Sequence, residues 1–447
     1  MFHPHTPADR ERMLKAIGAK SLEDLFADVP EAYRFPKLDL PEPMTEVEVM
    51  AELKSIAAEN DSVFDMPCFL GAGAYNHYIP AAVDNILRRG EFFTAYTPYQ
   101  PEVSQGTLQA IFEYQSHVVS LTGMDVSNAS HYDGATAAAE AINMAEAVHR
   151  GKRKKAVVSP AVHPHYRATI NTYIKSADFD IVGEDLKPES GPDDLIPLIT
   201  QDTAVVLVQY PDFFGRVFDY TELGRAAHEM GALLAVAINP TALALLKPPS
   251  EFGADIVCGE GQPLGIPLSY GGPYLGILAT KTDYVRTIAG RLVGETTDVE
   301  GKRGYVLTLS TREQHIRREK AASNICTNQG LMALAATVYI SLLGKEGLRE
   351  VANLCYQRAH YAAAEITKLA GYELWDKGSF FHEFVVKCPR PAQELATSLL
   401  ENGILGGYAL GTDYPGMENC MMFAVTEMNS KEEIDHLVSV LDEVRNG

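Results

Sequence analysis

The sequence predicts an α/β protein with a large, mostly parallel sheet followed by a small α+β domain at the C-terminal end. Three observations lead to this fold class. Short runs rich in Val, Ile and Leu alternate with amphipathic segments over residues 66–330. From about residue 331 the pattern changes to long helices with a few strands. With 447 residues, 46% of them hydrophobic, the chain can bury a large core and is too long for one simple domain.

Residues 1–65 are predicted to form an N-terminal helical arm. The stretch "TPADRERMLKAIG" offers Thr6 as the N-cap of one helix, and "SLEDLFADV" offers Ser21 as the N-cap of a second. A third helix is expected in "MTEVEVMAELKSIAAEN". We expect such an arm to wrap either a partner subunit or the core of its own chain.

Residues 66–330 are predicted to hold the large domain. Strands are expected in "KKAVVSP", "DIVGE", "AVVLVQYP", "LLAVAIN", "ADIVCG" and "YLGILAT". Helices are expected in "YTELGRAAHEMG" and from Gly134, where Asp133 is the predicted N-cap. Apolar strands that alternate with helices indicate a mostly parallel sheet covered on both faces.

Residues 331–447 are predicted to form the small domain. Two helices, "LMALAATVYISLLG" and "GLREVANLCYQRAHYAAAEITKLAG", each end at a glycine. The runs "FFHEFVVKC", "AQELATSLLENG", "CMMFAVTEM" and "KEEIDHLVSVLDEV" then follow the order strand, helix, strand, helix.

Composition narrows the classes of function. A net charge of −21 argues against nucleic acid or an anionic membrane as partner, because both are bound through basic patches. The six cysteines show no CxxC pair and no zinc-like spacing, which fits free thiols in a reducing compartment. The N-terminus lacks the apolar region of a secretory signal, and no apolar run is long enough to span a bilayer. We therefore expect a cytoplasmic protein without a bound metal.

A large α/β domain followed by a small α+β domain is the layout of pyridoxal phosphate (PLP) enzymes of the aminotransferase type, fold type I. A PLP site needs a helix N-terminus that binds the phosphate, because the free N–H groups there attract an anion. It also needs an aspartate against the pyridine nitrogen and a ring that stacks on the cofactor. A lysine must hold the cofactor covalently.

This chain offers a position for each of these parts, mostly with a different residue. The carboxylate of Asp133 would already fill the anion site. Asn239 ends the run "LLAVAIN", where an aspartate is needed, and an amide cannot pair with a pyridinium by charge. In "GADIVCGEGQPLGIPLSYGGPYLGILAT", Gln262 stands where the lysine is expected. Only His163 suits the stacking role. Each residue alone has an ordinary structural explanation, but together they predict a PLP fold that does not bind the cofactor by itself.

Over essentially its whole length the chain resembles the glycine cleavage system P-protein family, glycine dehydrogenase (decarboxylating). The resemblance is to the N-terminal half, or separate first subunit, which lacks the PLP lysine. The motifs that carry it are "FTAYTPYQPEVSQGTLQAIFEYQ" (residues 93–115), "NASHYDGATAAAEA" (128–141), "GEGQPLGIPLSYGGPYLG" (259–276) and "LSTREQHIRREKAASNICTNQGLMAL" (309–334).

The resemblance implies a second subunit that bears the PLP lysine, an active site at the interface of the two chains, and a two-plus-two heterotetramer. It also implies the reaction. Glycine loses its carboxylate as carbon dioxide at PLP, and the aminomethyl group passes to the lipoamide of H-protein.

The first of these motifs contains the residues that we predict to be catalytic at the shared site: Tyr96, Tyr99 and Gln100. They surround a proline turn before a helix whose predicted N-cap is Ser104. Turn chemistry explains the proline and Ser104 without any function. It does not explain paired tyrosines without helical or strand periodicity. Tyrosine joins a rigid apolar face to a hydroxyl, which suits the wall of a site or an interface.

Two further segments are predicted to contact substrate or partner. "GAGAYNHYIP" contributes Asn76 and His77, within a similar polar and aromatic mixture. "STREQHIRREK" is a basic cluster in an acidic chain, and its spacing places Arg312 and His315 on one helix face. A solvated helix face with internal Glu–Arg pairs is the alternative interpretation of the basic cluster.

Two other functions remain open from the sequence. The chain is a self-sufficient PLP enzyme if Lys247 or Lys281 takes the place of the missing lysine. It is a structural or regulatory pseudoenzyme if the degenerate site serves no reaction.

Overall fold

The computed structural model describes residues 5–175, 177–321 and 323–446. Their contacts divide the chain into two compact units, Met1–Asp61 and Ser62–Gly447.

The helices are α1 (Pro7–Ile17), α2 (Glu46–Ala57), α3 (Ala81–Leu87), α4 (Gln105–Thr122), α5 (Gly134–Val148), α6 (Pro164–Ile174), α7 (Pro192–Leu195), α8 (Thr221–Glu229), α9 (Gln314–Arg317), α10 (Gly330–Ile366), α11 (Ala392–Glu401) and α12 (Lys431–Glu443). The strands are β1 (Val126–Ser127), β2 (Lys155–Val158), β3 (Asp180–Val182), β4 (Thr203–Tyr210), β5 (Leu233–Ile238), β6 (Ile256–Glu260), β7 (Gly276–Thr280), β8 (Leu292–Thr297), β9 (Arg303–Thr308), β10 (Glu373–Leu374), β11 (Glu383–Lys387), β12 (Tyr408–Ala409) and β13 (Cys420–Ala424).

The first unit contains α1 and α2, and α1 begins with the cap that the sequence predicts. The Oγ1 of Thr6 accepts a hydrogen bond from the N–H of Asp9, and Thr45 caps α2 in the same way. The helix expected after Ser21 is wrong, because only a single 3₁₀ turn forms there, over Glu23–Phe26. None of these helices has a buried residue.

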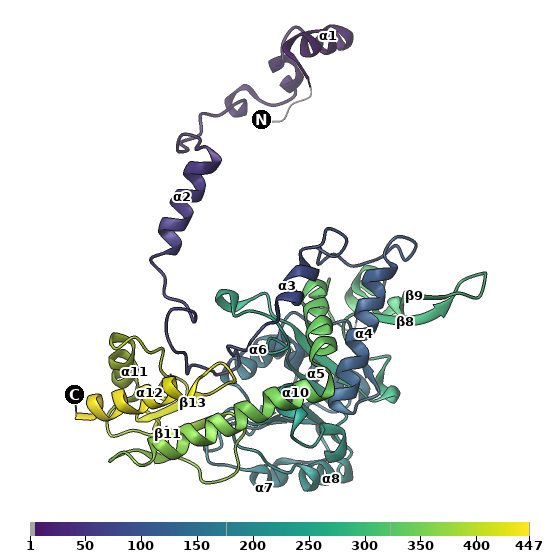
Figure 1. Ribbon diagram of the computed structural model, residues 1–447. Coiled ribbons are helices and arrows are strands. Elements are labelled where there is room, and N and C mark those ends of the chain that lie inside the picture. The colour runs from purple at the N-terminus through teal and green to yellow at the C-terminus, as the bar shows by residue number, and fades with distance from the viewer. Residues whose placement is uncertain (1–4, 176, 322, 447) are drawn as a thin grey trace. The chain divides into compact units, whose positions relative to one another are not determined.

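The second unit is built on a seven-stranded sheet with the strand order β1-β7-β6-β5-β4-β2-β3. Helix α10, drawn in green in Figure 1, runs from beside α4 to β11 and α12. The six strands predicted from the sequence are confirmed as β2 to β7. Strands β3, β2, β4, β5 and β6 run parallel, whereas β7 is antiparallel to β6 and to β1. The sheet is therefore mostly parallel, as predicted.

Helices cover both faces of this sheet because successive side chains of each strand point to opposite sides. Val206 and Val208 of β4 belong to the core that includes residues of α4, α8 and the start of α10. Val205 and Leu207 belong to the core that includes residues of α5 and α6. The strands are thus buried on both faces, as expected for a mostly parallel sheet, and the predicted α/β fold class is confirmed.

A four-stranded antiparallel sheet, with the order β10-β11-β13-β12, forms the C-terminal part. It packs against α11, α12 and the second half of α10. The segment before residue 71 joins this sheet, since the N–H of Phe69 donates to the carbonyl of Leu405 and the carbonyl of Phe69 accepts from the N–H of Ala424. These contacts position the following residues 71–78 beside the carboxyl end of β6, where Tyr75 hydrogen-bonds to Gln262.

By length and composition alone, helix α10 could cross a membrane, because its most apolar stretch has a mean hydropathy of 1.3. It is interrupted at Gly344 (φ 60°), as the two helices in the sequence predict. Its first half packs into the core of the large sheet and its second half into the small domain. These contacts are those of a core helix. The domain bounds 66–330 and 331–447 stay a prediction.

Candidate functional site

The N-terminus of α5 lies at the carboxyl edge of the sheet, where a parallel α/β fold places ligands. Asp133 caps this helix, and its Oδ1 accepts a hydrogen bond of 2.7 Å from the N–H of Thr136. The N–H of Gly134 donates to Oε2 of Glu260 at 2.9 Å. Oε1 of Glu260 accepts from the N–H groups of Gln262 and Leu275. Burial raises the pKa of Glu260 to about 8, against the effect of these backbone donors. Two side-chain carboxyl groups therefore occupy the anion position.

Gln262 is buried and fully engaged. Its Oε1 accepts from the N–H of Tyr75 at 2.9 Å. Its Nε2 donates to the carbonyls of Tyr75 at 3.0 Å and Ile266 at 2.8 Å. The hydroxyl of Tyr75 donates to Glu383, and burial raises the pKa of that carboxyl to about 7. In place of a reactive amine, Gln262 supplies two hydrogen bonds that hold Tyr75 in the site and a third that fixes its own loop at Ile266.

The remaining cofactor positions are also filled by this chain. The Oδ1 of Asn239 accepts from the N–H of Thr241 at 3.0 Å. His163 stacks on Tyr166, with ring centroids 5.1 Å apart, and its Nε2 lies 2.7 Å from the carbonyl of Ala72. A Cβ at Gly134 would lie 1.9 Å from the Tyr166 hydroxyl, so Tyr166 closes the space at the helix end. These residues do not fit PLP.

The two alternative lysines lie elsewhere. Lys281 follows β7, which is antiparallel, so it lies at the opposite edge of the sheet from Gln262. Its Nζ donates to Asp255 at 2.6 Å. The Nζ of Lys247 lies 3.3 Å from the hydroxyl of Thr221 and over the ring of Phe252. Both amino groups are therefore held by residues away from the N-terminus of α5.

Restoring the lysine should not restore a PLP site. We expect the Gln262→Lys variant to form no covalent lysine–PLP adduct, because Glu260 and Tyr166 still occupy the cofactor position. The measurement is visible absorbance with added PLP, followed by borohydride reduction and mass spectrometry of the chain. Wild-type chain is the control, and a stable pyridoxyl-lysine at position 262 would contradict the prediction.

The predicted tyrosines lie in a second cluster that the sequence did not fully identify. Tyr96 and Tyr99 are 75% and 45% exposed, and their rings lie edge to face at 6.1 Å. The hydroxyl of Tyr99 accepts a hydrogen bond of 2.5 Å from Arg291. Arg291 is buried, lies over the Tyr99 ring and pairs with Glu313 at 3.2 Å. The ring of His315 lies 6.2 Å from Tyr99. An exposed aromatic surface is thus anchored by a buried ion pair.

Several sequence expectations around this cluster need correction. "STREQHIRREK" is not one helix, because the backbone is extended at Glu313. Arg312 ends one short turn and His315 lies in the next, so they do not share a helix face. The guanidinium of Arg312 binds the backbone carbonyls of residues 288, 290 and 309. Ser104 is at the N-cap of α4, but its side chain makes no capping hydrogen bond. Gln100 is exposed.

Known proteins match the chain from end to end. A model of the "Glycine cleavage system P-protein" family matches residues 1–441. A probable glycine dehydrogenase (decarboxylating) subunit 1 of Thermomicrobium roseum is 55% identical, over 99% of this chain and 99% of its own. Its counterpart in Geobacillus kaustophilus is 51% identical, over 98% of each chain. A crystal structure of glycine decarboxylase (P-protein) in inhibitor-bound form aligns with a TM-score of 0.92, at 43% identity, over 99% of this chain and 100% of that chain.

The chain belongs to the glycine cleavage system P-protein family. A sphingosine-1-phosphate lyase of Burkholderia pseudomallei shares the fold, with a TM-score of 0.66 at 15% identity over 93% of this chain and 94% of that one. The fold is that of PLP-dependent enzymes of fold type I, as the sequence predicts.

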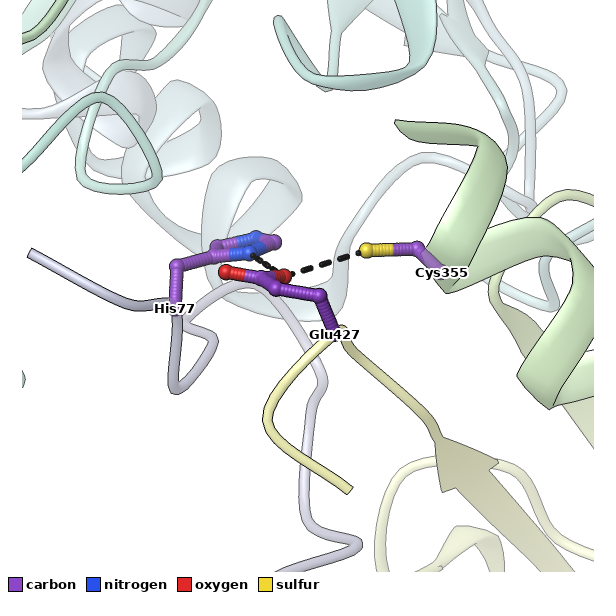
Figure 2. A group of neighbouring side chains, drawn as sticks. All are labelled: His77, Cys355 and Glu427. Atoms are coloured by element: carbon purple, nitrogen blue, oxygen red, sulfur yellow. Dashed lines mark hydrogen bonds and ion pairs between the residues drawn. The ribbon is translucent and has the colours of Figure 1, made fainter. Parts of the chain in front are cut away.

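A third cluster in this P-protein chain joins His77, Cys355 and Glu427 (Figure 2). Nδ1 of His77 lies 2.7 Å from Oε2 of Glu427, and the thiol of Cys355 donates to the same oxygen at 3.3 Å. The N–H of Tyr78 donates to Oε1 at 2.8 Å. The three ligand atoms lie within 4.8 Å of one another. All of these contacts are ordinary hydrogen bonds, so we interpret the cluster as a buried network.

This network should stabilise the fold through Glu427. Burial alone would raise its pKa, but His77 and the N–H of Tyr78 lower the pKa to about 2. The unfolded value is about 4.3, so the ionised group contributes roughly 3 kcal/mol above that pH, and the contribution disappears as the pH falls toward 2. We expect Glu427→Gln to lose about this much stability at pH 7 and much less at pH 3.

Urea unfolding followed by circular dichroism at both pH values measures this difference. Glu222→Gln is the matched control. Because Glu222 pairs with Arg225 on the surface, its replacement should lower the free energy of unfolding by less than about 1 kcal/mol. A loss for Glu427→Gln that is equal at pH 7 and pH 3 would rule out the electrostatic origin.

The structure places the remaining predicted residues and adds others. His77 is buried in the network, whereas Asn76 is half-buried and its carbonyl accepts from the Thr426 hydroxyl at 2.7 Å. Sequence reasoning missed Arg291, Glu313 and Glu260. Glu260 lies two residues before Gln262 and Glu313 lies directly after Arg312, so both stand within motifs that the sequence singles out, whereas no sequence signal points to Arg291. The assignment of site residues stays a prediction.

Proposed function

We propose that this chain is the lysine-free subunit of a two-chain glycine decarboxylase and that PLP is held by its partner subunit. One observation carries the proposal. The cofactor position of this chain is filled by Glu260, Tyr166 and Gln262, while Tyr96 and Tyr99 lie exposed on an anchored surface. The names of the relatives, glycine dehydrogenase (decarboxylating) subunit 1, support a two-chain enzyme.

In this proposal the partner's cofactor supplies an electron sink for the loss of carbon dioxide from glycine. The residues of this chain complete the shared site. The Tyr96 and Tyr99 hydroxyls position the substrate, and their rings exclude water from one side. Arg291 holds Tyr99 in place, because it contacts both the hydroxyl and the ring. Glu313 in turn neutralises Arg291.

The acceptor of the aminomethyl group is the lipoamide of H-protein, which would dock against the assembled subunits. A two-plus-two heterotetramer follows from the family resemblance. We also place the protein in the cytoplasm. All six cysteines are free thiols in the described structure, which supports a reducing compartment.

The test is exchange of labelled bicarbonate into the carboxyl group of glycine by the mixed chains with H-protein. The Tyr96→Phe/Tyr99→Phe variant keeps the aromatic packing, so it should still assemble with the partner. Each lost hydrogen bond is worth about 1 kcal/mol, or about fivefold in rate, so exchange should fall by at least that factor.

Tyr270→Phe serves as the matched control, because Tyr270 is 94% exposed and lies outside the cluster. Sedimentation of the mixed chains reports assembly separately from exchange. A double variant that assembles and exchanges at the wild-type rate would show that these tyrosines only pack, and it would favour the pseudoenzyme.

A further inference from the structure

An open basic groove of about 510 Å³ lies on the second unit, in a chain whose net charge is −21. Its charged lining residues come from the end of α5 and from the segments around residues 286 and 312–320: Glu146, Arg150, Arg286, Arg312, Arg317 and Lys320. Glu146 pairs with Lys154 at 2.5 Å, so its charge is already neutralised. The groove is therefore cationic although the protein as a whole is strongly anionic.

Three of these cations are free to meet a partner. Within the part of the chain that the structure describes, no ion pair is found for Arg150, Arg286 or Lys320, and all three are exposed. Arg312 and Arg317 donate to backbone carbonyls, which fixes their guanidinium groups without neutralising them. Fixed and free positive charges together favour an anionic occupant.

The form of the groove favours a protein segment over a small anion. Its charges are spread along three chain segments in an open groove, and two of its guanidinium groups already donate to this chain's own carbonyls. A small anion needs several donors that converge on one point. An acidic protein surface needs distributed charges instead. The anionic remainder of this chain would repel an acidic protein surface, and this repulsion would direct the acidic surface to the cationic groove.

The groove also adjoins the tyrosine cluster. Arg312 lines both the groove and a small cavity bounded by Arg291 and Glu313, the ion pair that anchors Tyr99. A carrier that docks in the groove would therefore lie beside the surface assigned to the shared site. We propose that this groove binds an acidic segment of the lipoyl-bearing carrier protein. This inference rests on the proposed function, since that function supplies the carrier.

The experiment measures binding of H-protein to the assembled two-chain enzyme by stopped flow at low and high salt. The groove variant is Arg150→Glu/Arg286→Glu/Lys320→Glu. The control variant is Lys345→Glu/Arg349→Glu/Lys377→Glu, which changes the net charge equally at exposed positions outside the groove. At low salt the groove variant should associate about tenfold or more slowly than the control, and the difference should vanish at high salt because exposed charges are then screened.

Equal association rates for the two variants would overturn the proposal, because net charge alone would then explain the effect. Failure of the groove variant, but not the control, to assemble with the lysine-bearing subunit would overturn it too, since the groove would then be a subunit contact. Bicarbonate exchange by the wild-type enzyme is measured in parallel. If the wild type binds H-protein through the groove but exchanges no bicarbonate, the proposed function fails and the docking site stands.

Discussion

Replacing Arg291 with methionine should reduce bicarbonate exchange by the mixed chains at least about 30-fold, which corresponds to roughly 2 kcal/mol in the transition state. Arg291 is 5% exposed, and it contacts the Tyr99 hydroxyl at 2.5 Å and Glu313 at 3.2 Å. Methionine keeps the apolar volume but removes both contacts. Tyr99 then loses its anchor, and Glu313 is left as a nearly buried charge without Arg291, with only His315 beside it at 3.5 Å.

Arg303→Met is a matched control for this variant. Arg303 also lies over a tyrosine, Tyr305, and faces a glutamate, Glu295, but its side chain is 63% exposed and the pair is 4.0 Å apart. Exposed ion pairs have small interaction energies, so we expect the Arg303→Met variant to exchange bicarbonate within about twofold of the wild-type rate. Arg291→Lys should be intermediate, because lysine keeps the charge but not the planar contact with Tyr99. If Arg291→Met assembles normally and exchanges as fast as Arg303→Met, Arg291 does not position Tyr99 for the reaction.

Deleting residues 1–61 should weaken association with the lysine-bearing subunit by at least about 100-fold. The helices of this unit bury none of their own residues, and large apolar side chains such as Phe35 (58% exposed), Leu40 (70%) and Val47 (79%) face solvent. Burying one such side chain is worth about 1.5–3 kcal/mol, so covering a few of them would dominate assembly. We therefore expect the full heteromer to bury more than about 2,000 Å² in total.

The deletion variant should keep its fold, because residues 62–447 form a compact unit of their own. Circular dichroism checks this, and analytical ultracentrifugation of the mixed chains measures association. Leu40→Asp/Val47→Asp in the full chain is a milder variant that should weaken assembly in the same direction. An undiminished affinity of the deletion variant for its partner would show that the apolar surface of this unit serves another purpose.

Local sequence predicted the elements of this protein well, for physical reasons that individual positions show. The strand "AVVLVQY" is apolar on both faces, and it becomes the central β4 with Val206 and Leu207 buried on opposite sides. Thr6 and Asp133 cap helices as predicted, because capping depends on neighbours in sequence. The helix in "STREQHIRREK" was wrong, since helical spacing of charges did not reveal that Glu313 is extended to reach Arg291.

By itself, the sequence determined the fold class, the absence of a lysine at position 262 and the replacement of an aspartate by Asn239. These are properties of single positions or of short periodic patterns, and they predict a PLP fold that does not hold its own cofactor. Only the tertiary structure decided what occupies the vacated position and what anchors the tyrosines. Glu260 meets Gly134 across 126 residues, Arg291 meets Tyr99 across 192, and His77 meets Glu427 across 350. Such contacts depend on how the elements pack, because neither periodicity nor capping carries information over those separations.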